Sequence, residues 1–205
     1  QSQDIDMPSL VKIVRSKQPE LIVVDRDVPG PYQNYLTPEQ QIPDSVLPYP
    51  WETCMTMGGS WSYVATDKYK PSDELVEKLV DVVSKGGNFL LNIGPSPTGE
   101  FAPDAYARLN DLARWMKING EAIYGTRPVD RFSEGDRIRF SQRKDHTVRY
   151  IYLMDRPAGS ILLKNISIPK QANVHVLGSD VPCKHTITEQ GILLTIPEKA
   201  IVKGE

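Results

Sequence analysis

The sequence has little cysteine or histidine, and neither residue type is arranged for metal binding or redox chemistry. The two cysteines, Cys54 and Cys183, lie far apart and fit no metal or redox spacing. The histidines all fall in the last third of the chain, and no pair of them has the spacing of metal ligands: His146, His175 and His185. We therefore expect no metal and no cofactor. Two buried free thiols are favoured, with a disulfide bridge as the alternative.

Long apolar runs and an excess of charge of one sign are also absent. No apolar run approaches the roughly 20 residues of a membrane span, and nothing at the N-terminus resembles a signal peptide. The formal net charge of −2 gives no basic surface for nucleic acid. The 205 residues, 40% hydrophobic and 24% charged, suit one large globular domain or two small ones. The chain opens on QSQDIDMPSL without an initiator Met, so we expect it to be a piece of something longer.

The first 126 residues alternate between short apolar runs and amphipathic segments. Helices are predicted where apolar residues recur at helical spacing, with Asp6 and Ser72 as caps: 8–17, 72–84 and 103–119. Buried strands are predicted at three apolar or loosely alternating runs: 21–24, 51–57 and 88–93. This alternation is typical of a parallel α/β sheet with helices outside. Three strands cannot close a barrel, which agrees with a truncated chain.

The character of the sequence changes at about Arg127, where helical periodicity disappears. Short alternating or β-branched runs follow, separated by turn signals: 137–140, 147–153, 160–163, 173–177 and 191–196. Strands at this spacing predict a small antiparallel β-sandwich. We place the boundary between Gly125 and Pro128, which divides the chain into domains 1–126 and 127–205.

The stretch from Leu36 to Tyr63 is dense in Pro, Gly and aromatic residues, and it holds one well-placed acid, Glu39. Loops of this composition often carry functional sites. Arg26, Trp61 and Asn92 likewise follow the carboxyl ends of predicted strands, the edge at which parallel α/β sheets bind ligands.

Structural roles remain open for each of these residues. Glu39 is equally explained as a surface acid, Arg26 as an ion-pair partner of Asp25 or Asp27, and Trp61 as a core residue. Asn92 is expected to be mainly structural, with a hydrogen bond across the mouth of the sheet.

Five blocks, taken in order, resemble a known family: Arg26, TPEQQIP, PWETCMTMGGSWSY, GGNFLLNIGPSPTGE and INGEAIYGTRP. Together they are similar to the α-L-fucosidases of glycoside hydrolase family twenty-nine, from about Pro8 to Pro128. The resemblance implies the C-terminal portion of a (β/α)8-like TIM barrel followed by a β domain. It also implies a retaining exo-hydrolase acting on fucosylated glycans, in which an Asp is the nucleophile and a Glu acts as acid, then base. Such relatives are periplasmic, secreted or lysosomal.

The resemblance implies a role for each matching residue. Glu39 is similar to the family's acid/base, and Arg26 to its sugar-binding Arg. Trp61 falls where the family keeps an aromatic side chain against the fucose ring. Trp51 and Glu52, the family's WE pair, join the substrate-binding set in supporting roles. A general acid needs a carboxyl group whose pKa is raised by apolar neighbours or by the charge of the nucleophile.

The sequence departs from the family pattern at the nucleophile. No W-x-D-G block occurs here, and none of the four acids near the N-terminus lies in such a motif: Asp4, Asp6, Asp25 and Asp27. We therefore expect the nucleophile to lie outside this chain, on a missing N-terminal barrel half, and this chain alone to be inactive. Two alternatives stay open: a non-catalytic carbohydrate-binding protein and a glycosidase with another sugar preference.

Overall fold

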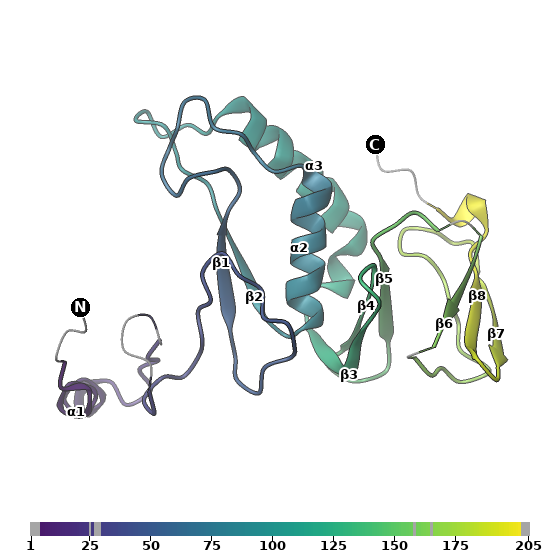
Figure 1. The fold of residues 1–205 in the computed structure, drawn as a ribbon, viewed down its shortest axis with the longest axis horizontal. Helices are drawn as coiled ribbons and strands as arrows, with labels where there is room; N and C mark the ends of the chain where they lie inside the picture. Colours follow the sequence, from purple (N-terminus) through teal and green to yellow (C-terminus); the bar gives the residue numbers. More distant parts are fainter. Residues whose placement is uncertain (1–4, 25, 27–29, 158, 165, 202–205) are drawn as a thin grey trace.

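The computed structural model describes residues 5–24, 26, 30–157, 159–164 and 166–201. Its elements form successive layers, which Figure 1 shows from left to right. Helix α1 (Met7–Lys17) lies at one end, followed by the strands β1 (Glu52–Thr56) and β2 (Asn88–Asn92). Helices α2 (Ser72–Ser84) and α3 (Pro103–Asn119) form the next layer, and two small β-sheets follow.

The three predicted helices are confirmed to within a residue at each end. The Asp6 carboxylate caps α1 by accepting a hydrogen bond from the Ser9 amide at 3.1 Å. Helix α2 ends before Gly86, whose φ of +82° is a conformation that glycine adopts without strain. The prediction that Ser72 caps α2 is wrong. Pro71 holds that position, and the Ser72 hydroxyl instead bonds to the carboxylate of Asp111 on α3.

The expected parallel pairing is present between β1 and β2, with Cys54 opposite Leu90 and Thr56 opposite Asn92. Helices α2 and α3 cover one face of this pair, where a shared core contains Met57, Leu75 and Ala105, all fully buried. This packing fixes the direction in which both strands leave the sheet.

The predicted strand 21–24 is wrong for most of its length. In the described part of the chain its β pairing is a single bridge between Val24 and Tyr35, and Ile22 is 67% exposed. The Val23 amide donates at 2.9 Å to the Asn34 side-chain oxygen, which also accepts from Arg15. The Asn34 backbone amide also donates to the Val23 carbonyl at 2.7 Å. The backbone at Val23 is therefore bonded to one residue, Asn34, and not to a regular ladder on a neighbouring strand.

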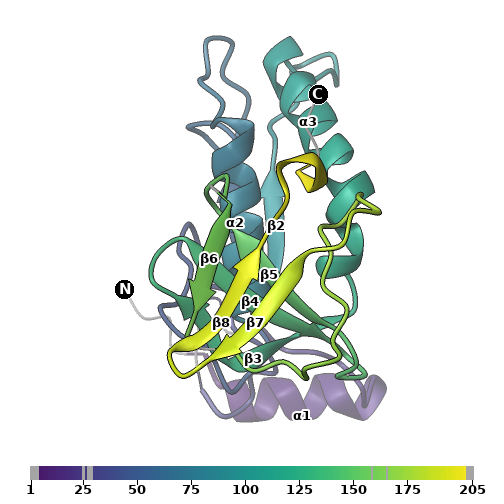
Figure 2. The same ribbon diagram turned by 90° about the vertical axis from the view of Figure 1, so that its right-hand side faces the viewer.

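The last 80 residues form two three-stranded antiparallel sheets, which face each other in Figure 2. The first contains β3 (Thr126–Glu134), β4 (Ile138–Arg143) and β5 (Arg149–Leu153); the second contains β6 (Ser160–Leu163), β8 (Gly191–Thr195) and β7 (Lys184–Thr188). One core joins them, and its buried side chains include Phe140 of the first sheet and Leu163, Ile192 and Leu194 of the second. The expected antiparallel sandwich is therefore present.

Three details of this region differ from the prediction. The run 173–177 forms only a bridge between His175 and Pro182. Strands β3 and β7 were not predicted. Strand β3 carries Pro128 and a register shift that interrupts its pairing with β4, so its sequence lacks regular alternation. Short 3₁₀ turns follow α3, at Gly120–Ala122, and β8, at Glu198–Ala200.

Helix α2 also packs against β3 and β4. The Asp81 carboxylate accepts from Arg139 at 2.6 Å and from Lys85 at 2.8 Å. Next to Asp81 in the sequence, Val80 packs in one buried cluster with the rings of Tyr150 and Tyr152. The helical layer is thus attached on both sides, and the division at residue 126 stays a prediction.

Candidate active site

The segment that carries Glu39 lies beside β1 and extends the parallel pairing by short contacts. Leu36 bridges Trp51, and Glu39 bridges Cys54. The amide of Gln40 donates to the Cys54 carbonyl at 2.9 Å. The backbone of Glu39 is therefore fixed to the middle of a strand, although its local sequence predicted a loop.

The turn after Glu39 is held by several polar contacts. Gln40 has a φ of +56°, a left-handed conformation that costs a non-glycine residue about 1–2 kcal/mol. Its side-chain amide donates to the Thr56 hydroxyl at 3.2 Å and accepts from the Thr56 backbone at 3.4 Å. The Thr53 hydroxyl donates to the Gln41 carbonyl at 2.7 Å. Strain of this kind persists where surrounding contacts impose it, and such positions are common near functional sites.

One guanidinium links two side chains at this position. Nη2 of Arg26 lies 2.8 Å from Oε2 of Glu39, and Nη1 lies 3.8 Å from Sγ of Cys54. The hydrogen bond to Glu39, and secondarily that to Cys54, raises the pKa of Arg26. Both charged side chains are nearly half exposed, at 46% and 44%, so the pair is accessible to a ligand. The alternative partners Asp25 and Asp27 lie outside the described residues.

The two faces of the β1–β2 pair differ in what they carry. Side chains alternate along a strand, so Glu52, Cys54 and Thr56 share one face, and Thr53 and Met55 share the other. On the first face Glu52 and Cys54 are partly exposed, whereas Thr56 is buried at the end of the strand, where it bonds to Gln40. Helices α2 and α3 cover the face of Thr53 and Met55. On the other face, which we call the open face, Leu90 is 45% exposed. The cluster of Arg26, Glu39 and Cys54 therefore lies on the open face.

Trp61 lies in the loop that follows β1, and it is 39% exposed. This loop is anchored at its base: the Lys70 ammonium donates to the carbonyls of Thr56 at 2.6 Å and Gly58 at 3.0 Å. Gly94, just after β2, approaches the Tyr63 backbone so closely that an added Cβ would lie 2.4 Å from its nitrogen. The loops after β1 and β2 thus meet at the carboxyl edge (Figure 1). The exposure of Trp61 shows that its side chain is not part of the core.

The WE pair is split between the two faces. Trp51 is 1% exposed, donates from Nε1 to the Lys85 carbonyl at 3.3 Å and packs against Gly87. Its ring has no exposed surface that a sugar could contact. Trp51 can therefore contribute to a site only by supporting β1, which begins at the next residue. Glu52 lies on the open face, two residues toward the amino end from Cys54.

Asn92 ends β2 on the open face. Its carbonyl accepts from the Met57 amide at 2.9 Å, which ties the exits of the two strands together. Its side-chain oxygen is buried and has no hydrogen-bond partner among the described residues. The expected hydrogen bond across the mouth of the sheet stays a prediction.

Cys54 is the residue of this cluster to which sequence reasoning gave no role. Its contact with Arg26 joins positions 28 residues apart, and no local pattern signals it. Both cysteines are free thiols; Cys183 is buried as expected, whereas Cys54 is only partly buried. Cys54 therefore belongs with the polar groups of the open face.

Over the described ranges, no group of three or more His, Cys, Asp or Glu side chains could hold a metal ion. Within the same ranges, no helix has the length and hydropathy needed to cross a bilayer.

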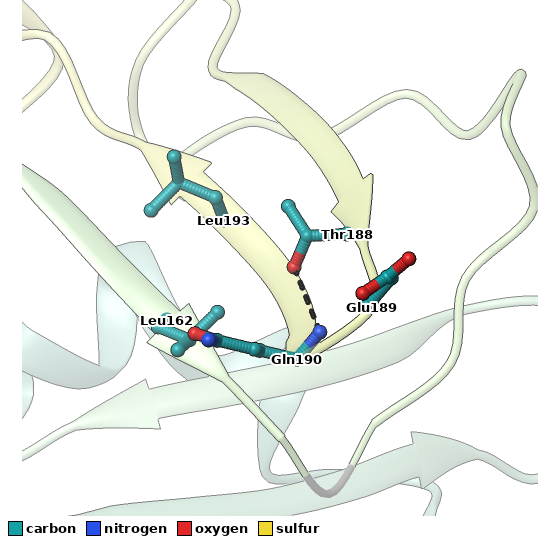
Figure 3. A pocket seen from close by; sticks show the side chains of 5 residues that line it. All are labelled: Leu162, Thr188, Glu189, Gln190 and Leu193. Atoms are coloured by element: carbon teal, nitrogen blue, oxygen red, sulfur yellow. Dashed lines mark hydrogen bonds between the residues drawn. The ribbon is translucent and has the colours of Figure 1, made fainter.

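A separate open hollow of about 380 Å³ lies on the outer surface of the second sheet (Figure 3). Leu162 and Leu193 form its floor, and the β7–β8 turn, where the Gln190 amide donates to the Thr188 hydroxyl, forms its rim. It includes none of the predicted site residues.

The chain is similar to known proteins over most of its length. The family model described as "Alpha-L-fucosidase" matches residues 1–121. Human plasma α-L-fucosidase is 34% identical over 178 residues, which cover 82% of this chain and 38% of that protein. Mouse tissue α-L-fucosidase is 32% identical over 162 residues, which cover 76% of this chain and 36% of that protein. The chain thus spans well under half the length of these relatives.

Solved structures give the same result. Isoenzyme 1 of the α-L-fucosidase from Paenibacillus thiaminolyticus superposes with a TM-score of 0.81 at 27% identity, over 96% of this chain and 51% of that one. The Thermotoga maritima α-fucosidase in complex with fucose superposes with a TM-score of 0.78 at 28% identity, over 95% of this chain and 45% of that one. The likeness extends through the antiparallel sheets, beyond the blocks that the sequence alone could match.

Proposed function

The chain belongs to the α-L-fucosidase family, and from that membership we propose that the complete protein is a retaining exo-glycosidase that removes terminal α-L-fucose from glycans. The observation that carries the proposal is the pairing of Arg26 with Glu39, half exposed, beside parallel strands. Ligands of α/β sheets bind at the carboxyl edge, where the Trp61 loop also lies. The printed names of the relatives support the choice of sugar.

We assign Glu39 the role of acid, then base. A nucleophilic Asp from outside this chain attacks the anomeric carbon while Glu39 gives its proton to the departing glycosidic oxygen. Glu39 then takes a proton from the water that attacks the fucosyl–enzyme ester, which frees fucose and restores the Asp carboxylate. Arg26 donates hydrogen bonds to the sugar, and Trp61 offers an apolar surface to its methyl side.

We also propose that the first 126 residues are the C-terminal portion of a (β/α)8-like barrel. The parallel pair β1–β2 has helices on one face, and its open face exposes Leu90. Earlier strands of the same parent chain would cover that face and bring the nucleophile. On this view the chain as given is inactive by itself.

Replacement of Glu39 by Ala in the complete protein tests the assignment. For aryl α-L-fucosides with poor leaving groups we expect kcat/KM to fall by about 10²–10⁴, because protonation of the leaving oxygen is lost. Activated dinitrophenyl fucosides should be slowed far less in the first step, and azide should restore turnover by replacing water. Glu189→Ala, on the distant β7–β8 turn, is the matched control and should leave both substrates unaffected.

Two results would contradict the proposal. Equal slowing of good and poor leaving groups by Glu39→Ala would remove the acid/base role. Turnover of another aryl glycoside by the complete protein, with none of α-L-fucosides, would remove the fucosidase assignment.

A further inference from the structure

The guanidinium of Arg26 has a second partner that the proposed mechanism does not use. While Nη2 contacts the Glu39 carboxylate, Nη1 contacts Sγ of Cys54 at 3.8 Å. A guanidinium is planar and its N–H groups form a fork of fixed geometry. The direction of one arm therefore determines where the other arm points.

Of the three groups, Cys54 is attached to the backbone with the most β pairing. It occupies the centre of β1 and pairs with Leu90, and its carbonyl accepts a hydrogen bond from the Gln40 amide. Arg26, in contrast, is a long and half-exposed side chain, and the nearest β pairing before it is the single bridge at Val24. The thiol is therefore the fixed point against which the guanidinium rests.

We propose that Cys54 is a positioning residue, which acts through Arg26 to hold the Glu39 carboxylate toward the open face. The inference rests on the proposed function, since it concerns the acid/base role of Glu39. A thiol is only a weak acceptor, so its effect is on orientation more than on binding strength. The ion pair alone would hold the carboxylate loosely, because both side chains are long and each can adopt several geometries that keep the contact.

The test replaces Cys54 by Val, which keeps a comparable volume without an acceptor, and by Ser, which keeps an acceptor on a shorter bond. In the complete protein we expect Cys54→Val to lower kcat/KM about three- to tenfold for fucosides with poor leaving groups. The same variant should change the value for dinitrophenyl fucosides less than twofold. Cys54→Ser should lie between Cys54→Val and the parent protein. Cys183→Ala, which removes the buried thiol of the β domain, is the matched control and should show no dependence on the leaving group.

A double-variant cycle separates positioning from general damage. In a Glu39→Ala background, Cys54→Val should have no further effect on poor substrates, because residues that act through one another are not additive. Losses that multiply, or that are equal for all leaving groups, would overturn the inference, and so would full activity of both Cys54 variants.

The same substrates distinguish this failure from that of the proposed function. If Glu39→Ala shows its leaving-group dependence and the Cys54 variants do not, only the positioning role is wrong. If Glu39→Ala itself lacks that dependence, the acid/base assignment fails first.

Discussion

The two faces of the β1–β2 pair are formed by alternate residues of the same short strands, yet they serve different ends. On the covered face Thr53, Met55 and Met57 are buried beneath α2 and α3. On the open face the strands carry Glu52, Cys54 and Asn92, with Arg26 and Glu39 beside them. The period of two in a strand thus separates the residues that stabilise the fold from those that are candidates for chemistry.

The difference has a consequence for mutations. A change on the covered side should act on stability and affect all substrates equally. A change on the open side should act on particular steps of the reaction and leave stability almost unchanged. The predictions for Trp51 and Glu52 test that division directly, and those for Asp81 and Tyr152 measure the stability of the layers that adjoin the covered face.

Trp51→Ala should have the largest effect on stability. The side chain is 1% exposed and packs against Gly87, so its removal leaves a large cavity that the strand cannot fill. We expect a loss of about 3–5 kcal/mol in the free energy of unfolding, measured by denaturant titration of the complete protein. The leaving-group dependence of any remaining activity should match that of the parent. A selective loss on poor leaving groups would place Trp51 in the site and break the comparison.

Asp81→Asn should come next, at about 3 kcal/mol. This carboxylate joins α2 to β4, and its partners Arg139 and Lys85 are 15% and 8% exposed. Removing one member of a largely buried ion cluster leaves the other charges without compensation. Asp155→Asn is the control, since its pair with Arg137 is exposed and should contribute at most about 1 kcal/mol. Equal losses of stability in the two variants would show that burial does not determine how strongly the Asp81 ion pairs stabilise the contact between α2 and β4.

Tyr152→Phe should cost about 1–2 kcal/mol at neutral pH, because the Ser141 hydroxyl and the Ala122 carbonyl each lose a buried partner. Burial raises the pKa of Tyr152 to about 12. A raised pKa means that the folded state keeps its proton longer than the unfolded state. The stability that comes from this pKa difference is therefore complete below pH 10 and is lost as the pH rises toward 12.

The alkaline loss should be about 2–3 kcal/mol, from a shift of two pKa units. Denaturant midpoints measured between pH 8 and pH 12 should fall less steeply in Tyr152→Phe than in the parent. Tyr124→Phe, at a ring that is 73% exposed, is the control and should keep the parental slope. A parental slope in Tyr152→Phe would contradict the role of burial.

The sequence predicted the elements whose signals are local. Helices α2 and α3 have regular apolar spacing and clear stops, and their bounds agree with the structure. The run 21–24 is equally apolar, but a strand needs a partner, and Val23 instead bonds to the Asn34 side chain. Strand β7, Lys184–Thr188, is a polar edge strand with mostly exposed residues, so periodicity could not reveal it.

The candidate site divides in the same way. The resemblance gave Arg26 and Glu39 separate roles, and the structure adds that they contact each other at 2.8 Å. Cys54 could not be placed from the sequence because its contact with Arg26 depends on how two distant segments pair. The resemblance placed Trp51 beside Glu52 in the substrate-binding set. Only the structure shows that its ring is buried and not at the surface.

Glu52→Gln should have the smallest effect. It tests whether position along β1 determines which residues of the open face take part in the reaction. Glu52 lies on the same face as Cys54 but about 6.5 Å toward the amino end of the strand, whereas Glu39 lies level with Cys54. Its backbone amide, which donates to the Leu36 carbonyl at 3.0 Å, is retained in the variant. We therefore expect a change in stability within about 0.5 kcal/mol and no change in leaving-group dependence, measured on the same fucosides as for Glu39→Ala. If Glu52→Gln instead slowed poor leaving groups and azide restored the rate, the proton donor would be Glu52, and position along the strand would not separate support from chemistry.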